Sequence, residues 1–278
     1  MKIKIVTDST SDLPAPLVSQ LGVTVVPSYV HFGNNVYRDR VDISEEEFYE
    51  RLRNGPVHPH TEPPTPMDFA ESYRRLLGGA EGIISIHISS KLSATCNSAR
   101  RGRELAGKNL PIEVIDSQLV TMGLGLLVIA AAAELGPSAG LAEAAAKVRK
   151  TIPAIHMLGL MDTLKYLARG GRIGRVKALL GTALRVKPML TIKDGELEPA
   201  GTAGSRADGI ERLRHFIGDA RGCQDMAIVH STTPEEACGL ARKVKPDFPA
   251  DIKLARLGPV LGTHAGPGGL FVAVRMRL

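Results

Sequence analysis

The stretch ISIHISSKLSATCNSA, residues 84–99, decides the fold of this chain. Residues 83–88 are mostly apolar and predict a short buried strand. A hydroxyl-rich turn follows at residues 89–93, and we expect a helix from Ala94. Free backbone N–H groups and the positive end of the helix dipole meet at such a turn, so it suits an anion.

The hydroxyl groups of this turn allow two interpretations. Ser93 and Thr95 would add hydrogen-bond donors to an anion site. Alternatively, Ser90 or Ser93 simply caps the helix, and the turn taken alone favours this second interpretation. The rest of the chain has to decide between them.

Two other predicted strands also end in acidic and hydroxyl residues. Residues 2–6 lead to Asp8-Ser9, and residues 112–115 lead to Asp116-Ser117. Strands that alternate with helices predict a doubly wound parallel α/β domain, whose ligand crevice lies at the carboxyl ends of the strands. We therefore expect these polar groups to converge on one rim.

The pattern changes after Ile152-Pro153. Apolar runs flank Asp194-Gly195, which predicts a hairpin, and further strands mix with helices up to residue 276. This mixture predicts an α+β domain with a mixed sheet. We therefore expect two domains, at residues 1–152 and 153–278.

Two irregular segments connect these elements. Residues 58–66 are rich in proline and fit neither a helix nor a central strand. Residues 258–269 contain so many glycines that we expect a long loop. His264 lies inside that segment among small neighbours, so we expect its ring to be presented to a ligand rather than buried for packing.

Composition excludes several classes of protein. The chain has 278 residues, a formal charge of +6, 4% aromatic residues and no Trp, which weakens the case for nucleic-acid binding through base stacking. The apolar run at 120–135 is rich in Gly and Ala and predicts a buried helix, so we expect no integral membrane segment.

The first ten residues predict a strand rather than a signal peptide. Three scattered cysteines then favour a reducing cytoplasm.

Few motifs suggest catalysis or metal binding. We expect no metal site, because His58 and His60 have no carboxylate or cysteine placed to complete one. No nucleophile elbow, phosphate loop or dinucleotide fingerprint is present, so we expect no cofactor.

Six motifs in order resemble the DegV family over the whole chain. They are TDSTSDLP (7–14), HTEPPTPMDF (60–69), SSKLSATCNSA (89–99), VIDSQLVTMGLG (114–125), LARGGRIGR (167–175) and GPVLGTHAGPG (258–268). The resemblance implies a bacterial, cytoplasmic fatty-acid-binding protein that is not itself an enzyme. It implies that a long-chain fatty acid is held while a separate fatty acid kinase catalytic subunit phosphorylates its carboxyl group. The acyl phosphate would feed phospholipid synthesis.

The same resemblance assigns residues by position. Thr61 and Ser93 match the family's carboxylate-binding hydroxyl groups, and His264 matches the histidine that completes the polar end. Further residues are expected to support this end or to face the partner: Ser90, Leu92, Ala94, Thr263, Arg172 and Arg206.

The chain departs from the family pattern at three positions. Many members have Gly at the position of Ala94 and Tyr at that of Cys96. Glu62 adds a negative charge near the site, which leaves the headgroup and chain-length preference open.

Two other functions compete with lipid binding. One is a stand-alone hydrolase or transferase that uses Ser93 with His264, although no acidic partner for the histidine is recognisable. The other is a regulatory or nucleic-acid-binding protein, which only the net charge supports.

Overall fold

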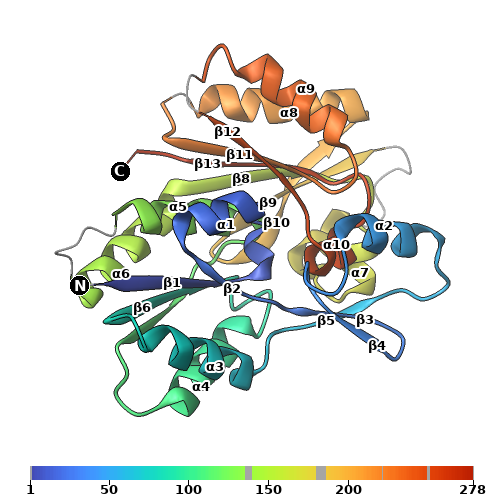
Figure 1. Cartoon of the computed structure of the whole chain (residues 1–278). Coiled ribbons are helices and arrows are strands. Elements are labelled where there is room, and N and C mark those ends of the chain that lie inside the picture. The colour runs from blue at the N-terminus through green and yellow to red at the C-terminus, as the bar shows by residue number, and fades with distance from the viewer. Residues whose placement is uncertain (1, 135–139, 180–185, 221, 249–250, 278) are drawn as a thin grey trace.

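The expected parallel sheet forms the lower part of the molecule in Figure 1. The structure is a computed structural model and describes residues 2–134, 140–179, 186–220, 222–248 and 251–277. The strands lie in the order β2 (Thr24–Val26), β1 (Ile3–Asp8), β6 (Gly82–His87) and β7 (Ile112–Asp116), all parallel. Because the strands are parallel, the carboxyl ends of β1, β6 and β7 meet at one edge, as predicted.

The predicted mixed sheet is also present. Its order is β10 (Glu196–Ala203), β9 (Lys187–Lys193), β8 (Ile155–Leu160), β13 (Leu270–Arg275), β11 (Asp225–His230) and β12 (Ile252–Arg256). Only β11 and β12 are parallel neighbours, whereas the other pairs are antiparallel. The predicted hairpin joins β9 to β10, with Asp194 and Gly195 at φ of 50° and 82°.

A third, small antiparallel sheet lies beside the other two. It contains β4 (Asn35–Arg38), β3 (Tyr29–Phe32) and β5 (His60–Glu62), in that order. The edge strand β5 comes from the proline-rich segment at 58–66, which agrees with the prediction that this segment is not a central strand.

The helices build layers around the two large sheets (Figure 1). Their bounds are α1 (Ala15–Leu21), α2 (Glu45–Asn54), α3 (Pro66–Leu77), α4 (Thr95–Ala106), α5 (Thr121–Glu134), α6 (Leu141–Thr151), α7 (Lys165–Arg169), α8 (Arg206–Asp219), α9 (Pro234–Val244) and α10 (Pro259–Ala265). Short 3-10 turns lie at Ser9–Ser11, Ile152–Ala154 and Gly174–Leu179. Helices α8 and α9 cover the outer face of the mixed sheet, and α3 and α4 cover that of the parallel sheet.

Helix α5 lies between the two large sheets, as its all-round apolar sequence indicates. Two glycines allow this close packing. A Cβ at Gly123 would lie 2.3 Å from the sulfur of Met157 on β8, and one at Gly125 would lie 2.8 Å from the carbonyl oxygen of Ser11. Within the described residues, no helix is both long enough and apolar enough to cross a membrane.

One hydrophobic core runs through both large sheets. It joins Ile84 and Ile86 of β6 to Met157 of β8 and Val229 of β11, with α5 in between. The domain boundary predicted at residue 152 falls where α6 gives way to a 3-10 turn and then to β8. Because the core is shared, the two domains of that prediction pack against a common helix.

The prediction of a long loop at residues 258–269 is wrong. Residues 259–265 form α10, which begins with Pro259 and ends at Gly266, where φ is 72°. Glycine within this helix serves close packing rather than irregular structure, since a Cβ at Gly262 would lie 2.6 Å from Phe48. His264 therefore stands on a helix.

Candidate functional site

Two segments far apart in sequence bring Thr61 and His264 together. Thr61 lies in the middle of β5, and His264 lies in the last turn of α10, which packs against β3 and β5. The Nε2 atom of His264 is 2.9 Å from the hydroxyl oxygen of Thr61. The structure thus places in direct contact two residues that the sequence predicted for one polar site.

The environment of His264 keeps its imidazole neutral. Burial lowers the pKa of His264 to about 4, and the positive charge of Arg172 and the nearby His58 act in the same direction. Its Nδ1 atom is buried without a hydrogen-bond partner in the described part of the chain. A Cβ at Gly170 would lie 2.1 Å from that Nδ1 atom, so only glycine fits beside the ring.

The turn before α4 supplies the second group of donors. The helix begins at Thr95, with Ala94 as its N-cap residue and no side-chain capping bond from that residue. The hydroxyl of Ser93 lies 2.8 Å from that of Thr95 and accepts a hydrogen bond from the Thr95 amide at 3.3 Å. When Thr95 donates to Ser93, the Ser93 proton is free for a ligand, and the first-turn amides of α4 face the same end.

These groups border a cavity of about 130 Å³. We call it the polar cavity because the hydroxyl groups and His264 lie on it, although most of its lining surface is apolar. Thr61, Ser93 and His264 all line it, so the structure brings together the three residues predicted for the carboxylate site. The other lining residues are Thr10, Ser28, Glu62, Pro63, Ile88, Leu92, Ala94, Val120, Leu167, Arg172, Leu197, Val260 and Leu261.

Two polar lining residues were missed by the sequence analysis. Thr10 follows β1 at the predicted rim, and its strand-end position was a usable signal. Its hydroxyl donates to Asp8, so its oxygen offers only lone pairs to the cavity. Ser28 lies between β2 and β3, and no motif pointed to it. Its amide donates to the hydroxyl of Ser9 at 3.1 Å.

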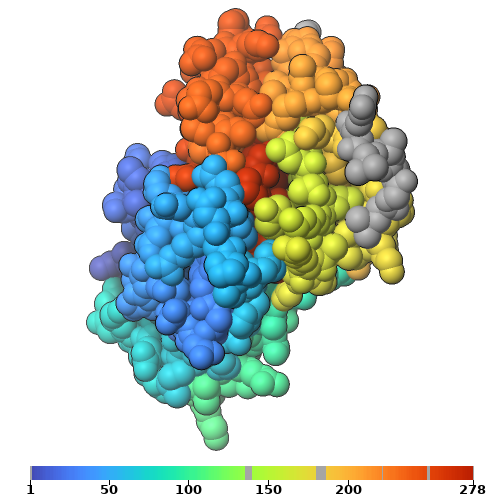
Figure 2. Space-filling model, turned by 90° about the vertical axis from the view of Figure 1, so that its right-hand side faces the viewer, coloured from blue at the N-terminus to red at the C-terminus, as the bar shows by residue number. Residues whose placement is uncertain are grey.

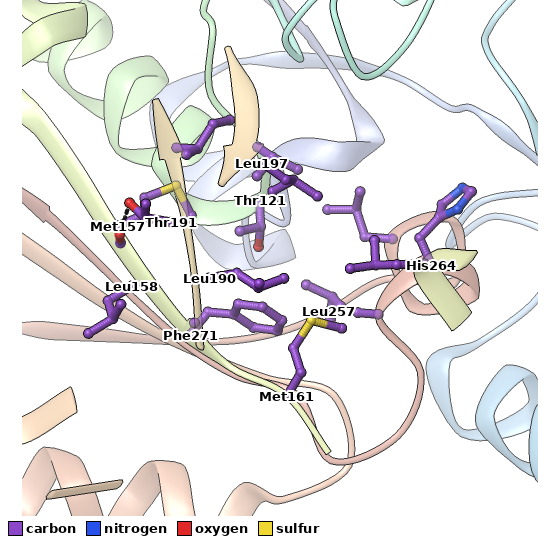
Figure 3. A pocket seen from close by; sticks show the side chains of 16 residues that line it. Thr121, Met157, Leu158, Met161, Leu190, Thr191, Leu197, Leu257, His264 and Phe271 are labelled. Atoms are coloured by element: carbon purple, nitrogen blue, oxygen red, sulfur yellow. Dashed lines mark hydrogen bonds between the residues drawn. The ribbon is translucent and has the colours of Figure 1, made fainter. Parts of the chain in front are cut away.

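A second, almost wholly apolar cavity of about 90 Å³ adjoins the first (Figure 3). Its walls come from β8, β9, β13 and α10, and His264 lies at one end. The residues that line both cavities are Val120, Leu167, Leu197, Leu261 and His264. The site therefore has a polar end and an apolar end, and the same side chains border both.

The polar cavity lies near the surface crevice seen in Figure 2, where α10 (red) is visible between the blue N-terminal segments and the yellow-green α7. Arg172 is exposed at this end and donates to the carbonyl oxygen of Gly170 at 2.7 Å. Within the described ranges, Arg172 makes no ion pair with a carboxylate. Its charge is therefore available at the mouth of the cavity.

Only some of the supporting residues predicted from sequence lie at the polar cavity. Leu92 and Ala94 line the polar cavity. The hydroxyl of Ser90 instead donates to Asp116, and that of Thr263 donates to the carbonyl oxygen of Pro259 at 3.0 Å. Neither Ser90 nor Thr263 borders either of the two cavities.

Arg206 is engaged elsewhere, at the start of α8. It forms an ion pair with Glu236 and donates to the carbonyl oxygen of Gly268 at 2.6 Å. Arg206 does not line the two cavities, and its contacts hold the glycine turn that follows α10.

A buried array below the polar cavity has the composition of a catalytic triad. Asp8 lies 3.0 Å from His87, whose other ring nitrogen lies 2.6 Å from the hydroxyl of Ser85. The hydroxyl of Tyr73 extends the chain at 2.7 Å from Ser85. All four side chains are fully buried, so this array ties the carboxyl ends of β1 and β6 together and cannot meet a substrate.

The reason given for expecting no metal is wrong. The structure places a carboxylate, that of Glu62, with His60 and with His31 from the neighbouring strand. The potential ligand atoms of these three side chains all lie within 4.8 Å of one another. Sequence spacing alone could not identify His31, because β3 and β5 are separated by α2.

A family model and a curated relative both match nearly the whole chain. Residues 2–275 match the family model whose description reads "Uncharacterised protein, DegV family". A DegV domain-containing protein of Streptomyces coelicolor is 36% identical over 281 residues, which cover 99% of each chain.

Two solved structures share the fold over their full length. A DegV family protein from Thermus thermophilus, described by its fatty acid binding, is 35% identical with a TM-score of 0.91, over 99% of this chain and 100% of that one. DegV from Bacillus subtilis, described as a fatty acid binding protein, is 26% identical with a TM-score of 0.90, over 100% of both chains. The family match over nearly all residues and the shared architecture agree with the six motifs, and the chain belongs to the DegV family.

Proposed function

We propose that this protein binds a long-chain fatty acid, with the carboxylate in the polar cavity and the tail in the apolar one. The observation that carries this proposal is the junction of the two cavities beside the Thr61–His264 pair. Fatty-acid binding by the structural relatives supports it.

The carboxylate would be held by neutral donors and one helix end. A neutral His264 that donates from Nε2 to Thr61 leaves the Thr61 hydroxyl proton free for the ligand. Ser93 and the first-turn amides of α4 approach from the other side. Hydrogen bonds to a charged group contribute about 1.5–3 kcal/mol each.

The tail would supply most of the affinity, because burying each CH₂ contributes about 0.8 kcal/mol. The two cavities are smaller than the roughly 300–1,000 Å³ of ordinary ligand pockets. A long tail therefore has to displace side chains. Met157 and Met161 line the apolar cavity, and their unbranched side chains can adapt to an inserted chain.

The geometry favours binding over nucleophilic catalysis. His264 contacts Thr61 rather than Ser93, and its Nδ1 has no carboxylate partner in the described part of the chain. A nucleophilic serine needs a base that is itself oriented by a third group. A hydrolase or transferase that uses Ser93 with His264 is therefore the weaker proposal.

We further propose that the bound carboxylate is presented to a separate kinase subunit, which phosphorylates it to an acyl phosphate for phospholipid synthesis. Arg172 is the better candidate for the partner-facing residue, because Arg206 is already paired with Glu236. Arg172→Ala is expected to lower phosphorylation by the cognate kinase even at saturating fatty acid, where the lost cavity-lining charge no longer limits ligand binding. The matched control is Arg175→Ala, since Arg175 is exposed but paired with Glu196 and Glu198. Equal phosphorylation rates in wild type and both variants would remove Arg172 from the partner surface.

The binding proposal is tested by comparing a long-chain fatty acid with its methyl ester. The ester keeps the tail and loses the charge. We expect saturable binding of the acid, measured by calorimetry, and binding of the ester weaker by about tenfold or more, since one charge-assisted hydrogen bond contributes that much. Equal binding of acid and ester, or no saturable binding of the acid, would contradict the proposed site.

A further inference from the structure

Three side chains with metal-ligating atoms lie on one face of the small sheet. His31 on β3 is directly opposite His60 on β5, and Glu62 lies two residues further along β5. Residues two apart on a strand share a face, and directly opposite residues on antiparallel strands have their Cβ atoms about 5 Å apart. The backbone register therefore gathers these three side chains.

The distances suit a small divalent ion. The Nε2 atom of His31 lies 3.3 Å from a carboxylate oxygen of Glu62. Two ligands bound tetrahedrally at about 2.1 Å from Zn²⁺ are about 3.4 Å apart. The rings of His31 and His60 are stacked, with centroids 4.4 Å apart, and the potential ligand atoms of all three side chains lie within 4.8 Å of one another. The exposed His60 ring would have to rotate to aim a nitrogen at the ion.

The burial of His31 also favours a bound ligand. Its side chain is 14% exposed, and its Nε2 atom is buried without a hydrogen-bond partner among the residues described. Burying a polar atom without a hydrogen bond costs free energy. The Glu62 carboxylate pairs with this nitrogen only when His31 is protonated, whereas a bound ion would satisfy both groups. Glu62 is 60% exposed, which gives an ion access to the site from solvent.

We propose that His31, His60 and Glu62 bind one late first-row divalent cation such as Zn²⁺, with the fourth position open to water. Two imidazoles and one carboxylate suit Zn²⁺, whereas Mg²⁺ and Ca²⁺ prefer oxygen ligands alone. Zinc binding at this site does not require fatty-acid binding, although Glu62 also lines the polar cavity. Thr61 lies between His60 and Glu62, so the ion would also fix the strand that carries Thr61 to the middle of the small sheet.

The test is calorimetry of the full chain with zinc chloride, with magnesium chloride as the comparison ion. We expect one saturable Zn²⁺ site and no Mg²⁺ site. His60→Ala and Glu62→Gln change exposed side chains and should each weaken Zn²⁺ binding by about tenfold or more, since even the loss of a group that supports a metal ligand costs that much. His215→Ala is the matched control, because His215 is an exposed histidine 3.4 Å from Glu211 on α8.

Circular dichroism of each variant establishes that it is folded before the titration is compared. His31→Gln provides a third variant that removes the buried ligand. Absence of saturable Zn²⁺ binding by the wild type would overturn the proposal. Binding that is the same in the wild type, His60→Ala and Glu62→Gln would also overturn it, and would assign the ion to a different place.

Discussion

Thr61 is the residue on which the polar end of the site depends most directly. It lines the cavity and contacts His264, while its strand neighbour His60 is exposed and does not line this cavity. Ser93 reaches the same cavity from the start of α4. The two hydroxyl groups thus approach a ligand from different elements.

Thr61→Val and Ser93→Ala are expected to weaken fatty-acid binding separately. Each change removes one hydroxyl donor to a charged group and costs about 1.5–3 kcal/mol, or roughly 10–150-fold in affinity. Calorimetric titration with the fatty acid measures the effect. Thr24→Val, on β2 away from both cavities, is the control and should bind like wild type. Wild-type affinity in both Thr61→Val and Ser93→Ala would remove these hydroxyls from the site.

Site residues that stand in a sequence motif could be predicted, whereas residues that reach the cavity only through the fold could not. Thr61, Ser93 and His264 stand in recognisable motifs, and the structure gathers them at one cavity. Ser28 stands in no motif and reaches the cavity only because β2 passes into β3 there. Ser90 lies in the predicted turn, but its hydroxyl donates to Asp116.

Helix α10 shows how local composition misleads about an element. Glycines predicted a loop, yet tertiary packing requires a helix whose small residues approach α2 closely. The Gly258 amide donates to Asp12 at 2.9 Å, and Pro259 occupies the first turn, where its missing N–H costs nothing. The strands of the parallel sheet were predictable, because alternation of strands and helices is a local pattern that tertiary contacts did not override.

Gly262→Ala is expected to destabilise the protein by about 1–3 kcal/mol, because it overpacks a close contact. The new Cβ would lie 2.6 Å from Phe48 and 2.7 Å from the hydroxyl of Tyr49. Urea unfolding measures the change. Gly239→Ala on α9 is the matched control, since its Cβ meets nothing nearer than Arg242 at 4.0 Å.

The control should move stability in the opposite direction. Alanine in a helix interior is favoured over glycine by about 0.5–1 kcal/mol, so Gly239→Ala should be slightly more stable than wild type. If Gly262→Ala were as stable as wild type, α10 would not be packed against α2 as described.

Buried charged side chains connect different parts of the molecule, as α5 does. Asp12 accepts from Thr121 of α5 at 2.6 Å and from Gly258 at the start of α10, and it forms an ion pair with Arg40 at 3.0 Å. Burial raises the pKa of Asp12 to about 7 and that of neighbouring Asp39 to about 6, with Arg40 opposing both shifts. This cluster links the parallel sheet to the helix that carries His264.

The raised pKa of Asp39 predicts a pH dependence of stability. Between about pH 4 and 6 the folded state holds a proton that the unfolded state releases, so the free energy of unfolding falls as the pH rises through this window. The full change across this window is on the order of 3 kcal/mol. Asp39→Asn removes this proton exchange. Urea unfolding at about pH 4.5 and about pH 7.5 should therefore show a smaller fall in the variant than in the wild type.

The comparison between wild type and variant measures Asp39 together with its effect on the pKa of neighbouring Asp12, which the Asp39 charge helps to raise. The lowered pKa of His264 acts with the opposite sign, because the unfolded state then binds more protons between about pH 4 and 6.5, but it contributes equally to both proteins. The same fall in wild type and Asp39→Asn would show that Asp39 is ionised throughout this range.

The proposed function requires that one fatty acid lies in the joined cavities. The most direct measurement is mass spectrometry of lipid extracted from denatured protein that was purified from a bacterial host. Leu197 lines both cavities and is half-buried on β10, so Leu197→Trp fills their junction. Leu105→Trp, on the exposed face of α4, is the control. We expect stoichiometric fatty acid in wild type and Leu105→Trp and little in Leu197→Trp. Wild-type protein without lipid, or Leu197→Trp with as much as wild type, would contradict the proposed function.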